Sequence, residues 1–127
     1  VDFGTALTFT AVGHDGVILG VSIAPGLQTA IKALFMNTSK LPEVELKLPE
    51  SALGKNTIHA IQAGILYGYT GLVKGMLEAI RKETQLEFKV IATGGLSSIL
   101  TSLEGVFDEV DRNLTLEGLR LITESNS

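Results

Sequence analysis

Apolar and polar side chains alternate along the first 24 residues in a way that predicts β structure. A period of two is typical of a half-buried strand. Here it places Leu7, Phe9 and Ala11 on one side and Thr8, Thr10 and Val12 on the other. Asp15-Gly16 is a strong signal for a tight turn. The β-rich run Val17–Ile23 is therefore expected to return antiparallel to the first strand, and Pro25-Gly26 to end it.

Two helices are expected in the middle of the chain. The first runs from Leu27 to near Asn37, with an apolar face at helical spacing made of Leu27, Ala30, Ile31 and Leu34. The second and longest runs from Asn56 or Thr57 to Thr84, and its many glycines predict a kink. Lys40-Leu41-Pro42 begins an extended connector, and Glu43–Lys47 is predicted to be a short exposed strand or an extended loop.

The last third of the chain is expected to return to the sheet. A short buried strand is predicted from Glu87 or Phe88 to Ala92, followed by a turn at Thr93-Gly94-Gly95. The remaining predicted elements are a helix over Leu96–Leu103, a brief strand over Phe107–Val110 and a helix over Leu116–Glu124 capped by Thr115. This order of elements predicts a mixed α/β fold.

Composition and charge narrow the class of protein. A length of 127 residues fits one domain, and 45% hydrophobic residues suffice for a core. The net charge of −4 argues against a nucleic-acid partner. We expect no membrane span and no signal segment, and the absence of cysteine fits the cytoplasm. Because Val1 begins directly in a strand-like motif, we expect another domain upstream of it.

The first candidate for chemistry is Asp2-Phe3-Gly4-Thr5. An acidic residue at a strand end can hold a cation. Gly4 would let a phosphate approach backbone N–H groups, and Thr5 offers a hydroxyl beside them. The alternative is a strand end with a hydrogen-bonded Asp and an ordinary turn glycine.

The second candidate is Thr93-Gly94-Gly95, where a strand breaks into two glycines before a predicted helix. Such a turn leaves room for a flat ligand against the backbone and adds free N–H donors at the helix start. An ordinary strand-to-helix turn would have the same residues. Two such turns in one small domain are more informative than either alone.

Gly54-Lys55-Asn56-Thr57 resembles the end of a Walker A loop, but we reject a P-loop. Pro49 stands where the first glycine of that motif should fall, and Asn56 stands where Ser or Thr should follow the lysine. From these residues alone, a helix start capped by Asn56 or Thr57 is the better interpretation.

Four glycines of the long predicted helix share one face, which we call the glycine stripe: Gly64, Gly68, Gly71 and Gly75. Each costs roughly 1 kcal/mol relative to Ala in a helix interior, and together they cost on the order of 3–4 kcal/mol. Close approach of another backbone, from this chain or from a partner subunit, is the expected compensation.

The remaining titratable residues suggest no catalytic group. His14 and His59 are the only histidines, both expected at the surface, so no catalytic triad can be assembled. A solvated face is expected for the acidic residues Glu43, Glu45 and Glu50. A loop without a metal ion is expected for Asp108, Glu109 and Asp111.

Seven motifs together resemble one known family, the type III pantothenate kinases of the acetate-kinase, sugar-kinase, Hsp70 and actin superfamily. They are Asp2-Phe3-Gly4-Thr5-Ala6, Ala24-Pro25-Gly26, Lys40-Leu41-Pro42, Gly54-Lys55-Asn56-Thr57, Gly64-Ile65-Leu66-Tyr67-Gly68-Tyr69, Ala92-Thr93-Gly94-Gly95-Leu96 and Leu114-Thr115-Leu116-Glu117-Gly118-Leu119. Their order and spacing make the resemblance specific, and it spans nearly the whole chain. It implies a ribonuclease H-like, actin-type ATPase domain, the second of two in the full-length protein, with residues 1–127 forming the C-terminal one.

The resemblance also implies an activity and its site residues. The activity is ATP-dependent phosphorylation of pantothenate to 4′-phosphopantothenate, the first step of coenzyme A synthesis. Asp2 would help bind a monovalent cation, K⁺ or NH₄⁺, beside ATP with Mg²⁺. ATP would contact Gly4 and Thr5, with Thr93-Gly94-Gly95 on the adenosine side. Thr57 would contact pantothenate, and the protein would be a homodimer.

Parts of the family pattern are absent or altered. The first phosphate motif, Asp-x-Gly-Asn-Thr, and the Gly-x-Asp-Arg segment with its proposed catalytic Asp would lie upstream of Val1, so the base cannot be named. Gly20-Val21-Ser22-Ile23 replaces one glycine of Gly-Gly-x-Ile. Two other functions stay open: a non-catalytic nucleotide-binding transcription accessory factor of the same family, and a kinase of another small alcohol or sugar.

Overall fold

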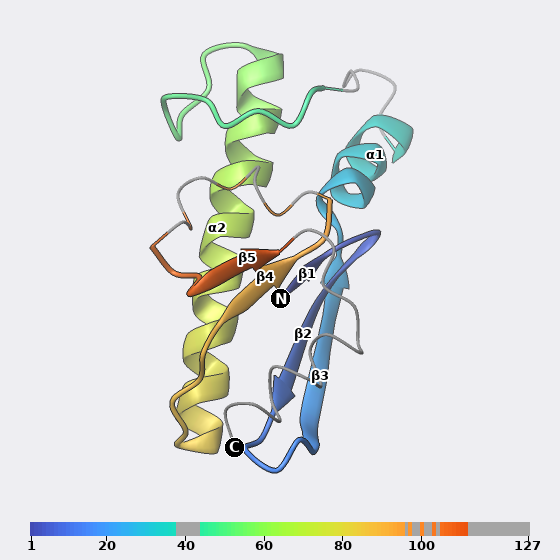
Figure 1. Ribbon diagram of the computed structural model, residues 1–127. Coiled ribbons are helices and arrows are strands. Elements are labelled where there is room, and N and C mark those ends of the chain that lie inside the picture. The colour runs from blue at the N-terminus through green and yellow to red at the C-terminus, as the bar shows by residue number, and fades with distance from the viewer. Residues whose placement is uncertain (38–43, 96, 98–99, 101–102, 104, 112–127) are drawn as a thin grey trace.

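The computed structural model describes residues 1–37, 44–95, 97, 100, 103 and 105–111. Over these residues the chain forms a five-stranded mixed sheet in the order β3-β2-β1-β4-β5, with two helices (Figure 1). The bounds are β1 Asp2–Phe3, β2 Ala6–Val12, β3 Ile18–Pro25, α1 Leu27–Asn37, α2 Thr57–Thr84, β4 Ile91–Thr93 and β5 Glu109–Asp111. The predicted mixed α/β class is confirmed.

The hairpin predicted from residues 7–23 is the antiparallel pair β2–β3. Its turn is closed by a hydrogen bond of 2.9 Å from Gly13 N to Val17 O, and the Asp15 carboxylate accepts one of 3.2 Å from Val17 N. Gly16 has a φ of 81°, which a glycine adopts at low cost. Leu7 and Phe9 are buried, whereas Thr8 and Thr10 are half-buried, as the period of two predicts.

Both predicted helices are present within a residue of their expected bounds. In α1, Leu27 and Ile31 are buried and Ala30 and Leu34 are half-buried, which confirms the apolar face. Asn56 caps α2, because its Oδ1 accepts a hydrogen bond of 2.9 Å from His59 N. α2 runs through all of its glycines without interruption, and the kink stays a prediction.

The extended segments differ more from expectation. The strand predicted from Glu87 or Phe88 to Ala92 is shorter and later, because Thr93 belongs to β4 and residues 85–90 belong to no strand. The strand predicted over Phe107–Val110 is β5, Glu109–Asp111. In both cases pairing with a neighbouring strand sets the bounds: β4 pairs with β5 from Ile91↔Glu109 to Thr93↔Asp111. For Glu43–Lys47 we expected either a short exposed strand or an extended loop. The described residues, 44–47, form a loop and not a strand.

Two predictions fall wholly or largely outside the described residues. The helix over Leu116–Glu124 and its Thr115 cap lie entirely outside them. Within the region predicted as a helix over Leu96–Leu103, Leu100 belongs to no helix and Leu103 to a short 3₁₀ turn, so a helix running through Leu100 is wrong. Leu100 and Leu103 are nevertheless buried in the core.

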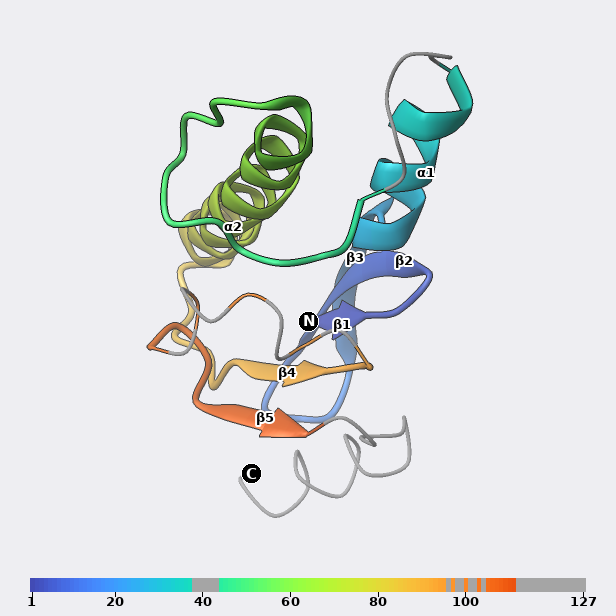
Figure 2. The same cartoon turned by 90° about the horizontal axis from the view of Figure 1, so that it is seen from above.

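The core lies between α2 and one face of the sheet (Figure 2). It is built from strand residues such as Phe3, Leu7 and Phe9 and from an α2 stripe that includes Leu66 and Val73. Burial of each such side chain contributes about 1.5–3 kcal/mol. The rings of Phe3 and Phe107 meet edge to face with centroids 5.9 Å apart, which ties β1 to the segment before β5.

The opposite face of β3 has no such cover from the described residues. Leu19, Val21 and Ile23 project from it, and Ile23 is 74% exposed. None of the described helices is long and apolar enough to cross a membrane.

Candidate functional site

The two turns singled out in the sequence lie side by side in the centre of the sheet. β1 pairs antiparallel with β2, with Asp2 opposite Thr8, and parallel with β4, with Asp2 opposite Thr93. A hydrogen bond of 2.8 Å from Thr93 N to Val1 O extends the parallel pairing. The structure therefore brings Asp2, Gly4 and Thr5 together with the turn at Thr93-Gly94-Gly95.

Gly94 makes the closest approach between the two turns. Its φ of +99° lies where residues with side chains are strained. A Cβ there would stand 2.6 Å from Phe3 O and 2.8 Å from Asp2 Oδ1. Both the conformation and the space thus require glycine, and two oxygens, one carboxylate and one carbonyl, converge on the same point. Ser97 holds the turn from the other side, because its hydroxyl donates a hydrogen bond of 2.8 Å to Gly94 O.

Gly4 and Thr5 form the connection between β1 and β2. Gly4 N donates a hydrogen bond of 3.2 Å to Ala6 O. A Cβ on Gly4 would lie 3.5 Å from Asp2 Oδ1, an ordinary contact, so packing among the described residues does not require glycine here. This leaves access for a ligand as a reason for the residue. The Thr5 side chain is exposed, and its backbone carbonyl accepts hydrogen bonds from Gly26, which precedes α1, and from Thr29 of α1.

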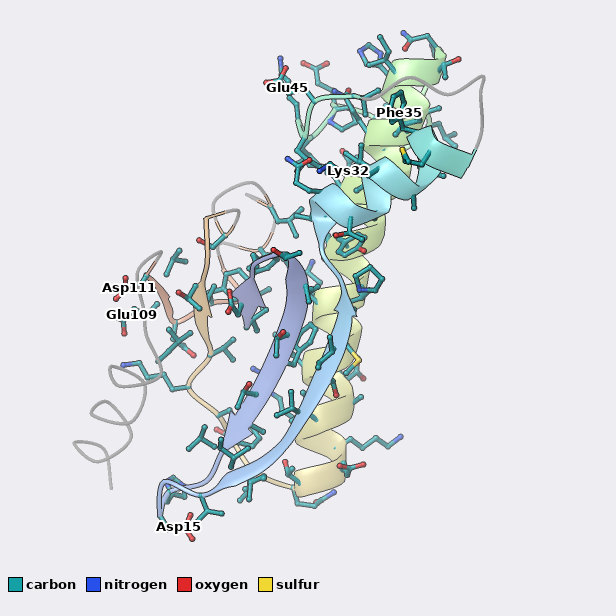
Figure 3. The ribbon with its side chains drawn as sticks, turned by 90° about the vertical axis from the view of Figure 1, so that its right-hand side faces the viewer. Asp15, Lys32, Phe35, Glu45, Glu109 and Asp111 are labelled. Carbon is teal, nitrogen blue, oxygen red and sulfur yellow. The ribbon has the colours of Figure 1, made fainter. Side chains whose placement is uncertain are left out.

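The carboxylate of Asp111 on β5 lies in the row of cross-strand partners that contains Asp2 and Thr93. Residues directly opposite one another share a face of the sheet, and the pairs Asp2↔Thr93 and Thr93↔Asp111 place Asp2 and Asp111 on one face. Their backbones are two strands apart, about 10 Å. Figure 3 shows Glu109 and Asp111 at the β5 end of the sheet. Sequence reasoning missed this alignment, since the only signal was the distant pairing of β4 with β5.

The interpretation of the acidic group at residues 108–111 as a loop is therefore wrong for Glu109 and Asp111, which belong to β5. Glu109 forms an exposed ion pair of 3.5 Å with Lys89. Asp108 precedes the strand, and its Oδ2 accepts a hydrogen bond of 2.6 Å from Val90 N. Among the described residues, no three His, Cys, Asp or Glu side chains are grouped so as to hold a metal ion.

Thr57 is not brought to this pair of turns. It begins α2, which projects beyond the sheet (Figure 1), and its side chain is exposed. It borders a hollow of about 410 Å³ between α1 and α2, lined by Leu34, Thr57, Ala60, Ile61, Gly64 and Ile65. Gly54 packs so closely on the helix start that a Cβ would overlap Ala60 N. The structure thus supplies a packing reason for Gly54 and a capping role for Asn56, and no phosphate loop.

The histidines lie as expected. His14 is exposed in the β2–β3 turn, and His59 is exposed in the first turn of α2. The ring Nδ1 of His59 lies 3.0 Å from the Asn56 side-chain amide, so this histidine belongs to the helix cap. Glu45 and Glu50 are exposed, as predicted, while Glu43 lies outside the described residues.

All four residues of the glycine stripe are exposed, and a Cβ on any of them would have no described atom within 4 Å. α2 buries its other side, from Ile61 to Leu77, against the sheet. Close backbone packing against the described part of this chain therefore does not compensate the stripe's cost.

A solved structure has the same fold: that of a conserved putative Baf family transcriptional activator from Campylobacter jejuni, with a TM-score of 0.63 and 24% identity over 98% of this chain and 56% of that one. This similarity defines the class, a mixed α/β domain. The family is defined by sequence. The family model of type III pantothenate kinases matches residues 1–79, and the chain belongs to that family.

Curated relatives agree over almost the whole chain. Type III pantothenate kinases from Myxococcus xanthus and Citrifermentans bemidjiense are 48% and 49% identical over 99% of this chain, which covers 49% and 50% of them. The chain therefore spans about half the length of the curated relatives it matches.

Proposed function

We propose that the full-length protein transfers the γ-phosphoryl group of ATP to pantothenate, giving 4′-phosphopantothenate for coenzyme A synthesis. The observation that carries this proposal is the contact of Gly94 with Asp2 and Phe3, which places two glycine-containing turns and one carboxylate at one point of the sheet. Phosphoryl transfer depends mainly on positioning and charge neutralisation, which such turns supply. The names of the curated relatives support the substrate.

Asp2 is the residue that we assign to a monovalent cation. Its side chain is exposed at the end of β1, and its Oδ1 and the carbonyl oxygen of Phe3 both lie beside the turn at Gly94. One carboxylate together with a carbonyl suits K⁺ or NH₄⁺, since hard cations prefer oxygen ligands. The cation would neutralise phosphate charge beside ATP with its Mg²⁺.

Gly4, Thr5 and the turn at Thr93-Gly94-Gly95 are proposed to contact ATP. Gly4 can admit a phosphate because its packing does not explain the glycine, and the Thr5 side chain is exposed beside it. The turn after β4 would take the adenosine side. We infer that the sheet is the second of two actin-type ATPase domains, with residues 1–127 as the C-terminal one and the catalytic base upstream of Val1.

Thr57 is proposed to contact pantothenate from the α2 start. Its exposed position beside the hollow between α1 and α2 supports this role and is compatible with the capping by Asn56. The exposed glycine stripe on the same helix supports a homodimer, because it offers a surface that another backbone can approach. We further propose a cytoplasmic enzyme without a nucleic-acid partner, in line with the net charge of −4.

The test is phosphate transfer by the full-length protein with ATP and pantothenate in K⁺ and in Na⁺. We expect transfer in K⁺, and we expect Asp2→Asn to lower kcat/KM about a hundredfold, because it weakens binding of the cation that neutralises charge on the transferred phosphate. Asp15→Asn is the matched control: Asp15 is an exposed aspartate whose described contact is within the hairpin turn.

Two other outcomes would replace the proposal. Absence of transfer to pantothenate in every salt would favour a non-catalytic accessory factor; the similar C. jejuni structure is described as a putative transcriptional activator. Transfer to a different small alcohol or sugar, with pantothenate inert, would instead favour a kinase of another substrate on the same fold.

A further inference from the structure

The backbone carbonyl of Thr5 is held by the start of α1. It accepts hydrogen bonds of 3.2 Å from Gly26 N and of 3.2 Å from the Thr29 hydroxyl. Gly26 is buried and packs so closely that a Cβ there would overlap Thr5 O. Figure 1 shows the β1–β2 turn reaching the base of α1. The position of the turn therefore depends on the position of Gly26.

Gly26 is in turn held from α2. The hydroxyl of Tyr69 donates a hydrogen bond of 2.6 Å to the carbonyl of Pro25, the residue directly before Gly26. Tyr69 is only 8% exposed and packs in the core, so its ring is fixed by its neighbours. Burial raises the pKa of Tyr69 above its ordinary value, which keeps the hydroxyl protonated and able to donate at working pH.

The direction of one N–H group follows from this arrangement. Thr5 C=O and Ala6 N–H belong to one planar trans peptide and point in opposite directions. Because the carbonyl points toward Gly26 and Thr29, the Ala6 N–H points away from α1, and the Thr5 side chain is oriented with the same peptide. A loss of the contact at Pro25 would let this peptide rotate.

We propose that Tyr69 is a positioning residue for the phosphate-binding turn, acting through Pro25 and Gly26 on Thr5. The proposal rests on the assignment of Thr5 to ATP in the proposed function. Tyr69 lies in the protein interior and touches the Pro25 carbonyl, so its effect on catalysis is indirect. Misplacement of a binding group by a fraction of an ångström is enough to lower the rate of a reaction that depends on positioning.

The chain offers a matched control two residues away. Tyr67 is on the same helix, and its hydroxyl donates a hydrogen bond of 2.8 Å to the carbonyl of another proline, Pro49. Pro49 lies in the loop before α2 and has no described hydrogen bond to the β1–β2 turn. Tyr67→Phe and Tyr69→Phe remove the same chemical group from equivalent bonds, and only the second is connected to Thr5.

The experiment compares full-length wild type, Tyr69→Phe, Tyr67→Phe and Thr29→Val, with Thr29→Ser as the conservative variant that keeps the hydroxyl. We expect Tyr69→Phe and Thr29→Val to lower kcat/KM for ATP roughly three- to tenfold, the effect of one lost hydrogen bond, with KM for pantothenate unchanged. Thr29→Ser should keep the wild-type kcat/KM for ATP. Tyr67→Phe should also leave kcat/KM for ATP unchanged, although it should lower Tm by about as much as Tyr69→Phe does.

Equal values of kcat/KM for ATP in Tyr69→Phe and Tyr67→Phe would overturn the proposal and leave Tyr69 a structural residue. Direct ATP binding, measured by calorimetry, separates this from a failure of the proposed function. If the wild type binds ATP and transfers no phosphate, weaker ATP binding by Tyr69→Phe alone supports the positioning role, and equal binding by both tyrosine variants rejects it.

Discussion

At the scale of single residues, Gly94 and Gly95 illustrate how neighbouring glycines differ. Gly94 has a positive φ and lies against Phe3 O and Asp2 Oδ1, whereas a Cβ on Gly95 would meet no described atom within 4 Å. The sequence Gly-Gly alone cannot distinguish them. The positive φ of Gly94, which would strain a residue with a side chain, and its close approach to β1 make it the residue on which the geometry of both turns depends.

We therefore expect Gly94→Ala to lower the free energy of unfolding by about 1–3 kcal/mol from backbone strain, with a further loss from the overlap with β1. Gly95→Ala should change it by no more than about 0.5 kcal/mol. Denaturant unfolding of both variants checks this. Equal stability of the two variants would contradict the close contact between the turns.

The candidate residues were predictable one by one from the sequence, but their grouping was not. Asp2 and Gly94 each stand in a recognisable local turn, since glycine and a strand end are visible in the sequence. Their contact depends on the parallel pairing of β1 with β4 across some 90 residues, which no local pattern encodes. A second parallel pairing, of β4 with β5, places Asp111 beside Thr93, and no local pattern encodes it either.

At the scale of elements, prediction succeeded where the signal was local. α2 was located by helical periodicity, and the Asn56 cap and the hairpin turn at Asp15-Gly16 act within three residues. β4 begins three or four residues later than predicted and β5 two residues later, and each ends one residue later. Their ends are set by the Val90 contact with Asp108 and by the cross-strand register, neither of which a period of two reveals.

The glycine stripe gives α2 two different faces. Its buried side packs on the sheet, and its glycine side is open in the described structure. A larger side chain at Gly68 would thus meet no clash within the described residues. Such a side chain should raise the stability of the isolated chain and lower the stability of a dimer.

We expect Gly68→Leu to stabilise the fold of a monomer slightly, by up to about 1 kcal/mol, because Leu has a higher helix propensity than Gly. The same change should weaken self-association of the full-length protein, since Leu blocks a close backbone approach. Gly68→Ala is the control, with a similar gain in propensity and little added bulk. Light scattering and thermal unfolding report the two effects. An unchanged oligomeric size for Gly68→Leu would remove the stripe from the interface.

At the scale of the whole molecule, two features of the described residues concern the proposed second domain. The two turns carry a single carboxylate, Asp2, and the apolar row Leu19, Val21 and Ile23 is open on the outer face of β3 among the described residues. Its curated relatives are about twice as long. Both features support the proposal that a second domain completes the site.

The isolated 127-residue chain is accordingly expected to show no measurable phosphate transfer from ATP to pantothenate, even in K⁺. In the proposed site the turns orient a phosphate and hold the cation that neutralises it. Removal of a proton from the acceptor hydroxyl also requires a base, which general acid–base catalysis makes worth about 10²–10⁴-fold in rate. We propose that this base and the other phosphate motif lie upstream of Val1. The measurement is a coupled assay of the isolated chain and the full-length protein at equal concentration, after circular dichroism has established that the isolated chain is folded. Turnover by the folded, isolated chain would contradict the division of the site between two domains and would locate the base among residues 1–127.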